Sequence, residues 1–372
     1  MAMLLVGQER KVAADTDAAK FETRAHRVEG VEDSSRGRVV HLMMWVLAVL
    51  AMVQTIVEIV VMIPCWIVWY RNKMEVMGHI KTKWYRGPWL CSSIFFDGSS
   101  RTLRAIRESA AGYKALHHIY NWRERKCWND VNLDVGHRFG EWLADWWIHM
   151  DNARAVRNRR VMVRYLIGEK LRLFADLYPG QNLRILSIAC GSAQPLQEAL
   201  AQQRAYLQKR NVTVELRLLD KDAAPLEHCV RLVERFGLNG WVKMMTHQCS
   251  YHDAYKVCGY GLWEPWLVEM IGLMDYLPTE KGKEAERMIY QLLAPGGYHL
   301  TGHILANSEA FVLRWLIAWP MRYRSPEDLG AMVAADGAFP RESVTLWLVP
   351  GQVHVLAEAH KVSGSFFGFA QV

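Results

Sequence analysis

The sequence predicts an α/β fold with a mostly parallel β-sheet, preceded by a helical N-terminal region that contains a membrane helix. Two observations predict it. From residue 183 onward, short apolar segments alternate with amphipathic segments, which is the pattern of strands joined by crossover helices. Before that point, 19 of the 22 residues from 42 to 63 are apolar. The 372 residues are 51% hydrophobic and 22% charged, which excludes an intrinsically disordered chain.

The apolar window over residues 42–63 has the length of one bilayer crossing. A helix of this length spans about 33 Å, and the hydrocarbon core of a bilayer is about 30 Å thick. Glu58 interrupts the window near its end, where an acidic side chain costs less than at the centre. Basic residues are slightly more numerous after the window than before it, which favours a cytoplasmic location for the chain that follows. A buried or oligomerisation helix and a re-entrant or interfacial helix remain alternatives.

Four regions follow from these patterns. We expect a polar leader over residues 1–38, a single-pass or monotopic membrane helix over 39–70, a Trp-rich basic helical connector over 71–150 and the main domain over 151–372. The histidines of the connector (His117, His118 and His137) lack the spacing of metal ligands, so we predict no metal site. The seven scattered cysteines include no C-x-x-C pair and are read as reduced thiols.

The main domain begins with a helix and continues as alternating strands and helices. Most of the arginines at the start of this helix are expected on a solvated face: Arg154, Arg157, Arg159 and Arg160. Strands are expected over residues 183–189, 212–219, 242–246, 266–271 and 298–304, with helices over 194–209, 223–236 and 279–293. Residues 343–348 and 352–357, joined by Val349-Pro350-Gly351, are typical of an antiparallel hairpin.

The end of the first strand in the main domain has the character of a cofactor-binding turn. Ala189, Gly191 and Ser192 are small and let the backbone approach a ligand, and the helix that follows presents unpaired N–H groups. Asp220 closes the next strand, where a carboxylate can accept hydrogen bonds from a ribose diol. Because ligands of open α/β sheets bind at the carboxyl ends of the strands, both segments are expected at one site.

Four strings carry a family resemblance: I-L-S-I-A-C-G-S-A at 185–193, L-D at 219–220, I-G-L-M-D-Y-L at 271–277 and L-L-A-P-G-G-Y at 292–298. In this order and spacing they resemble the class I S-adenosylmethionine-dependent methyltransferases over about residues 150–360. The resemblance implies a seven-stranded Rossmann-like sheet with an antiparallel last strand, and S-adenosyl-L-methionine as the cofactor. The chain contains no G-x-G-x-x-G or P-loop motif, which counts against a nicotinamide dehydrogenase or a P-loop enzyme.

The resemblance also assigns site residues. The implied cofactor-binding residues are Ser187, Ala189, Cys190, Gly191, Ser192, Asp220, Lys221, Asp222, Ile271 and Gly272, and the implied catalytic residues are Asp275 and Tyr276. The family's first motif usually begins with an acid that helps hold the amino end of the cofactor, whereas this chain has Ser187. Ala189 and Ala193 replace usual glycines. A catalytically degenerate fold that serves as a membrane scaffold is therefore the alternative.

Three strings, of which the first lies within one quoted above, favour one branch of that family. G-L-M-D-Y-L at 272–277 and W-P-M-R-Y-R-S-P-E-D-L at 319–329 resemble the bacterial branch that includes fatty-acid methyl ester forming enzymes, as does N-A-R-A-V-R-N-R at 152–159. A carboxylate acceptor needs no base, whereas a hydroxyl or an amine needs one, for which His252, Asp253, Asp275 and His303 are candidates. An aminopropyl transferase, which shares the cofactor, is disfavoured by the basic composition.

The expected partners are a lipid bilayer and a hydrophobic small-molecule substrate. The net charge of +7 suits an anionic membrane surface or a nucleic acid, but the chain has no motif of a nucleic-acid methyltransferase, so we expect no nucleic acid. Aromatic residues could form the wall of an apolar pocket beside the strand ends, although plain core is the commoner role for such residues: Trp263, Trp266, Trp315, Trp319 and Tyr323. A homodimer is left open.

Overall fold

The computed structural model describes residues 21–25, 28–32, 42, 45–50, 52–53, 56–57, 106, 112–121, 144, 147–315, 317, 319 and 321–362. Most of the predicted connector (71–150) and of the predicted membrane helix (39–70) lies outside these residues. The chain divides into two compact units. Unit 1 contains Met1–Val31, Asn158–Leu305 and Arg322–Val372, and unit 2 contains Glu32–Arg157 and Ala306–Met321.

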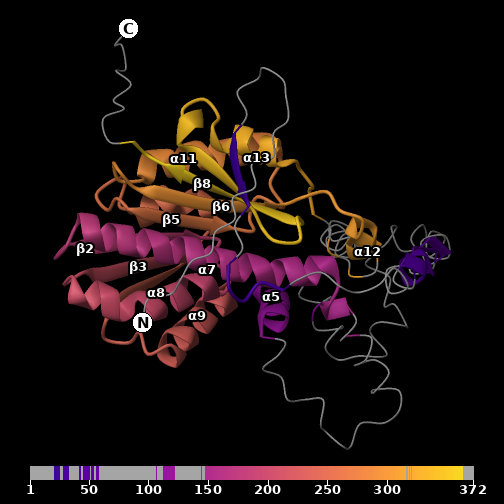
Figure 1. Ribbon diagram of the computed structural model, residues 1–372, viewed down its shortest axis with the longest axis horizontal. Helices are drawn as coiled ribbons and strands as arrows, with labels where there is room; N and C mark the ends of the chain where they lie inside the picture. Colours follow the sequence, from indigo (N-terminus) through magenta and orange to yellow (C-terminus); the bar gives the residue numbers. More distant parts are fainter. Residues whose placement is uncertain are drawn as a thin grey trace, which may run out of the picture. The chain divides into compact units, whose positions relative to one another are not determined.

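Unit 1 is built on a mixed β-sheet, which has eight strands among the described residues (Figure 1). They are β1 (Glu22–Ala25), β2 (Asn182–Ile188), β3 (Thr213–Asp220), β4 (Val242–Gln248), β5 (Leu267–Ile271), β6 (Tyr298–Ile304), β7 (Val344–Leu348) and β8 (His354–His360). Their order is β1-β7-β8-β6-β5-β2-β3-β4. Only β8 runs antiparallel to its neighbours, β6 and β7, which confirms the predicted antiparallel last strand.

The predicted count of seven strands is wrong because β1 adds an eighth, from within the predicted polar leader. Glu22–Ala25 pairs in parallel with the edge strand β7. All four of its side chains are exposed, so no alternation of apolar and polar residues marks this strand in the sequence. The preceding residue, Phe21, is buried. Phe21 packs so closely on Gly330 that a Cβ there would lie 2.6 Å from its ring, which anchors the strand.

Helices cover both faces of the sheet. On one face α7 (Asp151–Leu177), α8 (Gln194–Lys209) and α9 (Ala223–Arg235) supply apolar side chains to one core cluster. On the other face the same role belongs to α10 (Ala254–Val257), α11 (Thr279–Leu292) and α13 (Pro326–Val333). Short helices complete the described elements: α5 (Tyr113–Tyr120), η3 (Tyr251–Asp253), α12 (Ala310–Trp315) and η4 (Arg341–Ser343).

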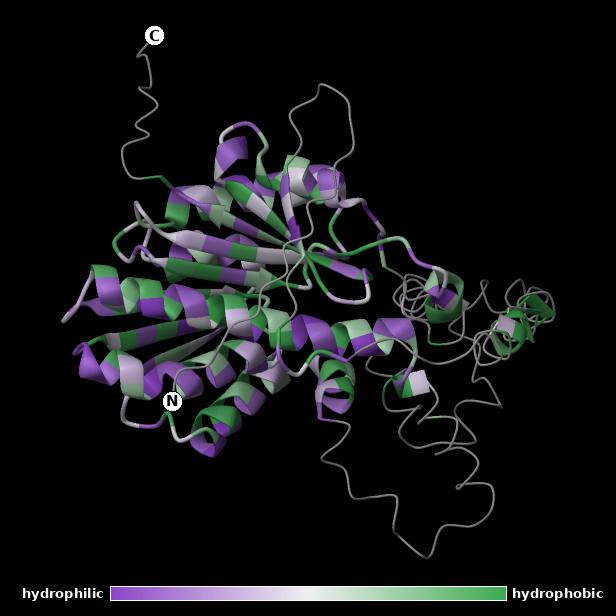
Figure 2. Ribbon diagram, viewed as in Figure 1, coloured by the Kyte–Doolittle hydropathy of each residue, from purple (hydrophilic) through white to green (hydrophobic). Residues whose placement is uncertain are grey.

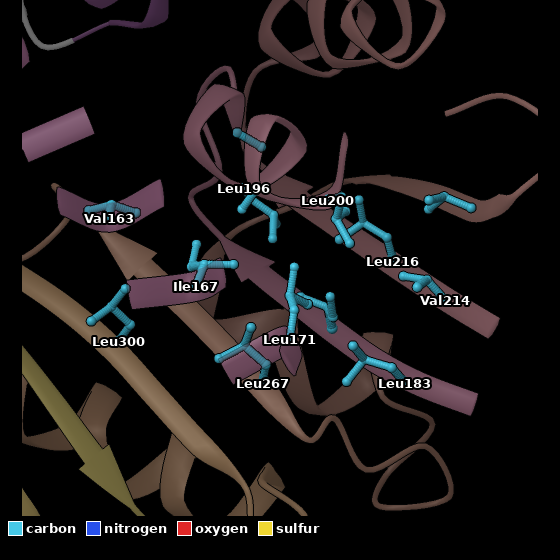
Figure 3. Packing of buried hydrophobic residues seen from close by; sticks show 14 of the residues in the cluster. Val163, Ile167, Leu171, Leu183, Leu196, Leu200, Val214, Leu216, Leu267 and Leu300 are labelled. Atoms are coloured by element: carbon cyan, nitrogen blue, oxygen red, sulfur yellow. The ribbon is translucent and has the colours of Figure 1, made fainter. Parts of the chain in front are cut away.

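The alternation of side chains along the strands divides the core between the two faces. In β2, Leu183 and Ile185 belong to the cluster with α7, whereas Leu186 and Ile188 belong to the other. Figure 3 shows three residues of α7 facing the sheet: Val163, Ile167 and Leu171. The predicted helix over 194–209 and strand over 298–304 have the observed bounds, and the other predicted elements from 183 onward differ by a few residues at most.

The arginines at the start of α7 do not lie on a solvated face, so that expectation is wrong. Arg154, Arg157 and Arg159 are 6%, 8% and 4% exposed. Their partners are carboxylates: Asp151 for Arg154, Glu32 for Arg157, Asp275 for Arg159 and Glu198 for Arg160. Burying guanidinium groups requires such partners, which local sequence does not reveal because three of the four carboxylates are distant in the chain.

Among the described residues, no helix combines the length and the apolar character needed to cross a bilayer. Of the predicted membrane helix, the structure describes helical residues at 42, 45–50, 52–53 and 56–57. These indigo segments of Figure 1 are mostly green, and thus hydrophobic, in Figure 2.

Candidate cofactor and active site

The candidate site lies where the strand order of the sheet reverses. From β2 the chain moves outward through β3 to β4, and then returns to place β5 on the other side of β2. Both neighbours of β2 are parallel to it, so the carboxyl ends of β2, β3 and β5 share one edge of the sheet. Such a reversal leaves a crevice at the carboxyl ends, which is where open α/β sheets bind ligands.

The turn from β2 to α8 adopts an unusual backbone. Ala189, Gly191 and Ala193 all have positive φ angles, of 50°, 51° and 44°. Left-handed backbone costs an alanine about 1–2 kcal/mol, a penalty that glycine avoids. Ala189 and Ala193, which stand where the sequence resemblance implies glycines, thus adopt the left-handed backbone that glycine favours. The helix α8 follows directly from Gln194, with Pro195 in its first turn.

Asp220, the last residue of β3, holds this turn in place. Its Oδ2 accepts a hydrogen bond from the Gly191 amide at 3.0 Å, and its Oδ1 accepts one from the Asp222 amide at 3.0 Å. Burial raises the pKa of the Asp220 carboxyl, although these two bonds oppose the rise. Each carboxylate oxygen has a further lone pair, so the group can still accept hydrogen bonds from a diol. The structure therefore brings together the two segments that the sequence predicted to meet.

The remaining residues of the turn and of the β3 end differ in exposure. Lys221 and Asp222 are exposed, whereas Ser192 is buried. Cys190 is also buried, and the Sγ atoms of Cys190 and Cys229 lie 3.6 Å and 3.4 Å from the carbonyl oxygen of Gly191. A hydrogen bond with Cys229 and burial raise the pKa of the Cys190 thiol well above its ordinary value. Cys190 is thus a packed thiol rather than a reactive thiolate.

Ser187 does not face a solvent-filled crevice, because it is fully buried. It pairs in register with Glu269 of β5, and its hydroxyl donates a 2.7 Å hydrogen bond to Oε2 of Glu269. Glu269 is 4% exposed, and burial raises the pKa of its carboxyl to about 7 against the opposing effects of Ser187, Arg159 and His299. Our sequence interpretation missed Glu269, although a lone acid within the apolar strand Leu267–Ile271 was a usable signal.

The segment after β5 carries the predicted catalytic pair. Ile271 and Gly272 are half-buried at the strand end, and a Cβ on Gly272 would lie 3.8 Å from the guanidinium nitrogens of Arg159. Tyr276 is half-buried as well. Asp275 is 3% exposed, and its Oδ1 accepts a 2.8 Å hydrogen bond from the Ile304 amide.

The carboxylate of Asp275 lies between basic groups. Nδ1 of His303 is 3.0 Å from Oδ1, and Nη1 of Arg159 is 3.6 Å from Oδ2. Burial alone would raise the pKa of the Asp275 carboxyl, but His303 and Arg159 lower it below its ordinary value. Both oxygens are therefore engaged in an ionised carboxylate. This arrangement suits a group that fixes the segment after β5, while a direct catalytic role for Asp275 and Tyr276 stays a prediction.

Arg324 joins two of the strings that resemble the fatty-acid ester branch. Its guanidinium donates to the carbonyl oxygens of Met274, at 2.9 Å, and of Leu277. It also lies 3.4 Å from Nε2 of His303, and the amide of the nearby Arg322 donates to the Asp275 carbonyl at 2.8 Å. The G-L-M-D-Y-L segment and the Y-R-S segment are therefore one hydrogen-bonded structure, although they are separated by about fifty residues in the sequence.

His354, at the start of β8, is a buried residue that the sequence did not reveal. It pairs with Ile304 across the antiparallel strands and is 1% exposed. Burial, assisted by the charge of Arg159, lowers the pKa of His354 to about 3, so the ring is neutral. Neither ring nitrogen makes a hydrogen bond of normal geometry within the described structure. His354 forms a cluster of buried polar side chains with Arg159, Asp275 and His303, next to the segment after β5.

The other candidate bases have ordinary structural roles. Asp253 accepts a 3.1 Å hydrogen bond from the Ser250 amide in a capping box at the start of η3. His252 is exposed, and its ring lies tilted against that of Tyr251 with ring centroids 3.9 Å apart. Among the described residues, no group of three or more His, Cys, Asp or Glu side chains could hold a metal ion.

The predicted aromatic wall is not formed by the tryptophans of unit 1. Trp263 and Trp266 belong to the two core clusters on opposite faces of the sheet. Trp266 also precedes β5, at the amino end rather than the carboxyl end, and packs edge-on against Phe174 with ring centroids 5.0 Å apart. Both residues are therefore core. The indole of Trp315 lies outside the described side chains, and Trp319 is a buried residue of unit 2.

Comparisons with known proteins give structural likeness only. No protein-family model matches the chain, and no curated protein matches it. A possible exported protein from Bordetella parapertussis is 18% identical with a TM-score of 0.49, covering 68% of this chain and 81% of its own. An O-methyltransferase family protein from Burkholderia thailandensis is 13% identical with a TM-score of 0.40, covering 68% and 72%.

Human N-acetylserotonin methyltransferase, solved in complex with S-adenosylmethionine, is 11% identical with a TM-score of 0.36, covering 66% of each chain. These likenesses are distant, at 11–18% identity and with TM-scores below 0.5.

Proposed function

We propose that the chain is an S-adenosylmethionine-dependent methyltransferase. The observation that carries the proposal is the hydrogen bond from the Gly191 amide to Asp220, which joins the small-residue turn to the acidic strand end at the reversal of strand order. A ribose diol and the rest of a nucleoside match this combination of a carboxylate and a close-approach backbone. The proposal is supported by four family-like strings, of which two form this turn and strand end.

The types of residue at the carboxyl ends of the strands suit the chemical groups of the cofactor. Asp220 would accept from the ribose hydroxyls, and the residues from Ala189 to Ser192 would face the rest of the nucleoside. When bound, the cofactor supplies an electrophilic methyl group on a sulfonium, which needs no acid to leave. The chain's own task is to align the acceptor and exclude water, so few catalytic side chains are required. Asp275 and Arg324 would contribute by fixing the segment after β5.

The acceptor class that we propose is a hydrophobic small molecule or lipid with a carboxylate or hydroxyl group. Support comes from the strings around Asp275 and Arg324, which resemble the branch with fatty-acid methyl ester forming enzymes and contact one another here. A carboxylate acceptor would need no base, whereas a hydroxyl acceptor would need one.

Two measurements test the proposal. Isothermal titration with S-adenosylmethionine should give binding to the full-length protein, and Asp220→Asn should weaken it at least tenfold, since charge-assisted hydrogen bonds contribute about 1.5–3 kcal/mol. Asp176→Asn is the matched control, because Asp176 forms an exposed ion pair on α7. Incubation with methyl-labelled cofactor and a total lipid extract should then label a lipid product. Binding without turnover would favour the degenerate scaffold, and no binding would refute the methyltransferase proposal.

We also propose that the described helical residues at 42, 45–50, 52–53 and 56–57 contact a lipid surface. Trp45 stacks on Phe311 with ring centroids 4.8 Å apart, and Ala48 is fully buried, so one side of this segment is packed. Apolar side chains on its other side are exposed: Leu42 by 66%, Val46 by 51%, Val49 by 41%, Val53 by 48% and Ile56 by 50%. A row of exposed apolar residues of this kind is typical of a membrane or protein contact.

Vesicle flotation tests this contact. The protein should float with phosphatidylcholine vesicles containing phosphatidylglycerol, and Val46→Asp with Val53→Asp should abolish flotation. Val230→Asp is the control, because Val230 is exposed to a similar extent, 42%, on α9. Unchanged flotation of the double variant would refute the proposal. If the double variant instead converts a dimer to a monomer in light scattering, the surface is an interface between two copies of the chain.

A further inference from the structure

A buried serine and a buried glutamate bridge the two strands on either side of the reversal of strand order. Ser187 of β2 and Glu269 of β5 are register partners, and the Ser187 hydroxyl donates to Oε2 of Glu269 at 2.7 Å. Both side chains point to the face of the sheet that α7 covers, because their neighbours Ile185 and Leu267 belong to the core cluster on that face. A carboxylate is thus placed two residues before the turn, on the strand beside it.

The surroundings of Glu269 leave its negative charge only partly compensated. Electrostatic interactions with Arg159 of α7 and His299 of β6 lower the pKa of Glu269. The charge of Glu269 in turn contributes to the raised pKa of the Cys190 thiol, which follows β2. Arg159 is shared with Asp275, 3.6 Å away, and His299 is 3.2 Å from its own partner Glu286. Burial therefore keeps the pKa of Glu269 near 7 despite these groups. A ligand cation that reached this carboxylate would provide the missing compensation.

The other carboxylates near this edge of the sheet are already engaged. Asp220 accepts from two backbone amides, and Asp275 accepts from the Ile304 amide and contacts His303 and Arg159. Glu269 accepts one hydrogen bond from a neutral hydroxyl. Ser187 itself carries no charge, although it occupies the position where the family-like motif has an acid.

We propose that Glu269, oriented by Ser187, is the carboxylate that binds the ammonium group at the amino-acid end of the cofactor. The inference depends on the proposed function, since it assigns a ligand group within the same site. The carboxylate that the motif lacks on β2 is supplied by β5 through a hydrogen bond between the two strands. Ser187 is then a positioning residue, whose hydroxyl holds Oε2 and leaves the second oxygen for the cation.

Two ligands that differ at the amino-acid end test the assignment. S-adenosylhomocysteine carries this end, whereas 5′-methylthioadenosine has the nucleoside without it. In isothermal titration of the full-length protein, Glu269→Gln should weaken S-adenosylhomocysteine binding tenfold or more, because a charge-assisted hydrogen bond is lost. Its effect on 5′-methylthioadenosine should stay within threefold. Glu286→Gln is the matched control, because Glu286 is also a buried glutamate paired with His299, but on α11.

A paired substitution separates the role of the charge from that of the fold. Ser187→Asp combined with Glu269→Gln returns the carboxylate to β2 and should restore S-adenosylhomocysteine affinity to within a few-fold of the wild type. Ser187→Ala alone should weaken it less than Glu269→Gln. Equal weakening of both ligands by Glu269→Gln, or no weakening, would overturn the assignment while the proposed function stands. Failure of the wild type to bind either ligand would overturn the proposed function itself.

A measurement on the wild type applies even where Glu269→Gln does not fold. If binding fixes Glu269 as a carboxylate, S-adenosylhomocysteine should release about half a proton at pH 7, since the pKa of the unliganded group is about 7. Titrations in buffers of different ionisation enthalpy measure this release. The release should be absent with 5′-methylthioadenosine. Equal release with both ligands, or none with S-adenosylhomocysteine, would count against Glu269.

Discussion

Replacing Asp275 by asparagine should destabilise unit 1 by about 3 kcal/mol at pH 7. The substitution preserves shape and an oxygen that can accept from the Ile304 amide, but it removes a buried charge that lies 3.0 Å from His303 and 3.6 Å from Arg159. Loss of one partner from a buried ion pair costs about 3–5 kcal/mol. The lower end applies here, because the carboxylate of Glu269 still acts on Arg159.

Urea unfolding followed by circular dichroism measures this loss, and Asp176→Asn is the control. Asp176 pairs with Arg210 at 2.8 Å, but both side chains are more than 40% exposed, so the same chemical change should cost at most about 1 kcal/mol. Because folding lowers the pKa of Asp275, its stabilisation is present above the unfolded pKa and is lost as the pH falls through the folded pKa. The difference between wild type and Asp275→Asn should therefore shrink in acid.

A double-mutant cycle of Asp275→Asn with His303→Gln isolates the pair. Residues in direct contact within a buried network couple by about 0.5–3 kcal/mol, whereas independent sites add to within about 0.3–0.5 kcal/mol. Additive effects, or a loss below 1 kcal/mol for Asp275→Asn alone, would refute the reasoning. A large fall in turnover with unchanged stability would instead assign Asp275 to the chemistry.

Four other substitutions have defined outcomes in unfolding experiments. Because folding raises the pKa of Glu269 to about 7, the free energy of unfolding should fall by about 3 kcal/mol as the pH rises from 4.5 to 8. Glu269→Gln should abolish this fall, whereas Glu284→Gln, at an exposed glutamate, should not. Because folding lowers the pKa of His354 to about 3, the free energy of unfolding should fall by up to about 5 kcal/mol as the pH decreases from 6.5 toward 3. His354→Gln should reduce this dependence on pH. An unchanged dependence would contradict the burial of a neutral ring. Ala189→Gly or Ala193→Gly should raise stability by about 0.5–1 kcal/mol, because relief of left-handed strain exceeds the entropy cost of glycine, and a loss of stability would show that the turn is unstrained.

The fold of unit 1 was predictable where strong local signals bound each element. The helix Gln194–Lys209 follows a small-residue turn and has a proline in its first turn, and the strand Tyr298–Ile304 follows the A-P-G-G turn. The strand Glu22–Ala25 was not predictable, because its side chains are all exposed and only its backbone joins the sheet. Strand addition at an edge needs a partner, which local sequence cannot specify.

The contacts of the candidate site were also predictable only in part. The meeting of Gly191 and Asp220 followed from strand ends, since parallel strands bring their carboxyl ends to one edge. The contact of Ser187 with Glu269 joins residues 82 positions apart and depends on the register of two strands, which periodicity does not determine. The burial of Arg159 was likewise missed, because a run of arginines on a helix has the same pattern whether or not distant carboxylates cover it.

The left-handed alanines change how the role of Asp220 should be tested. A turn that contains glycines adopts positive φ at little cost, whereas Ala189 and Ala193 must be held there by their surroundings. The holding contacts come from the end of β3: Asp220 accepts from the Gly191 amide, and the Leu219 carbonyl accepts from the Cys190 amide at 3.0 Å. Asp220→Asn should thus loosen the turn as well as remove the carboxylate that we propose accepts from the ribose. Adding Ala189→Gly to Asp220→Asn separates the two effects, because it restores the stability of the turn without restoring the carboxylate. If cofactor affinity stays low in this double variant, the loss of affinity is due to the missing carboxylate.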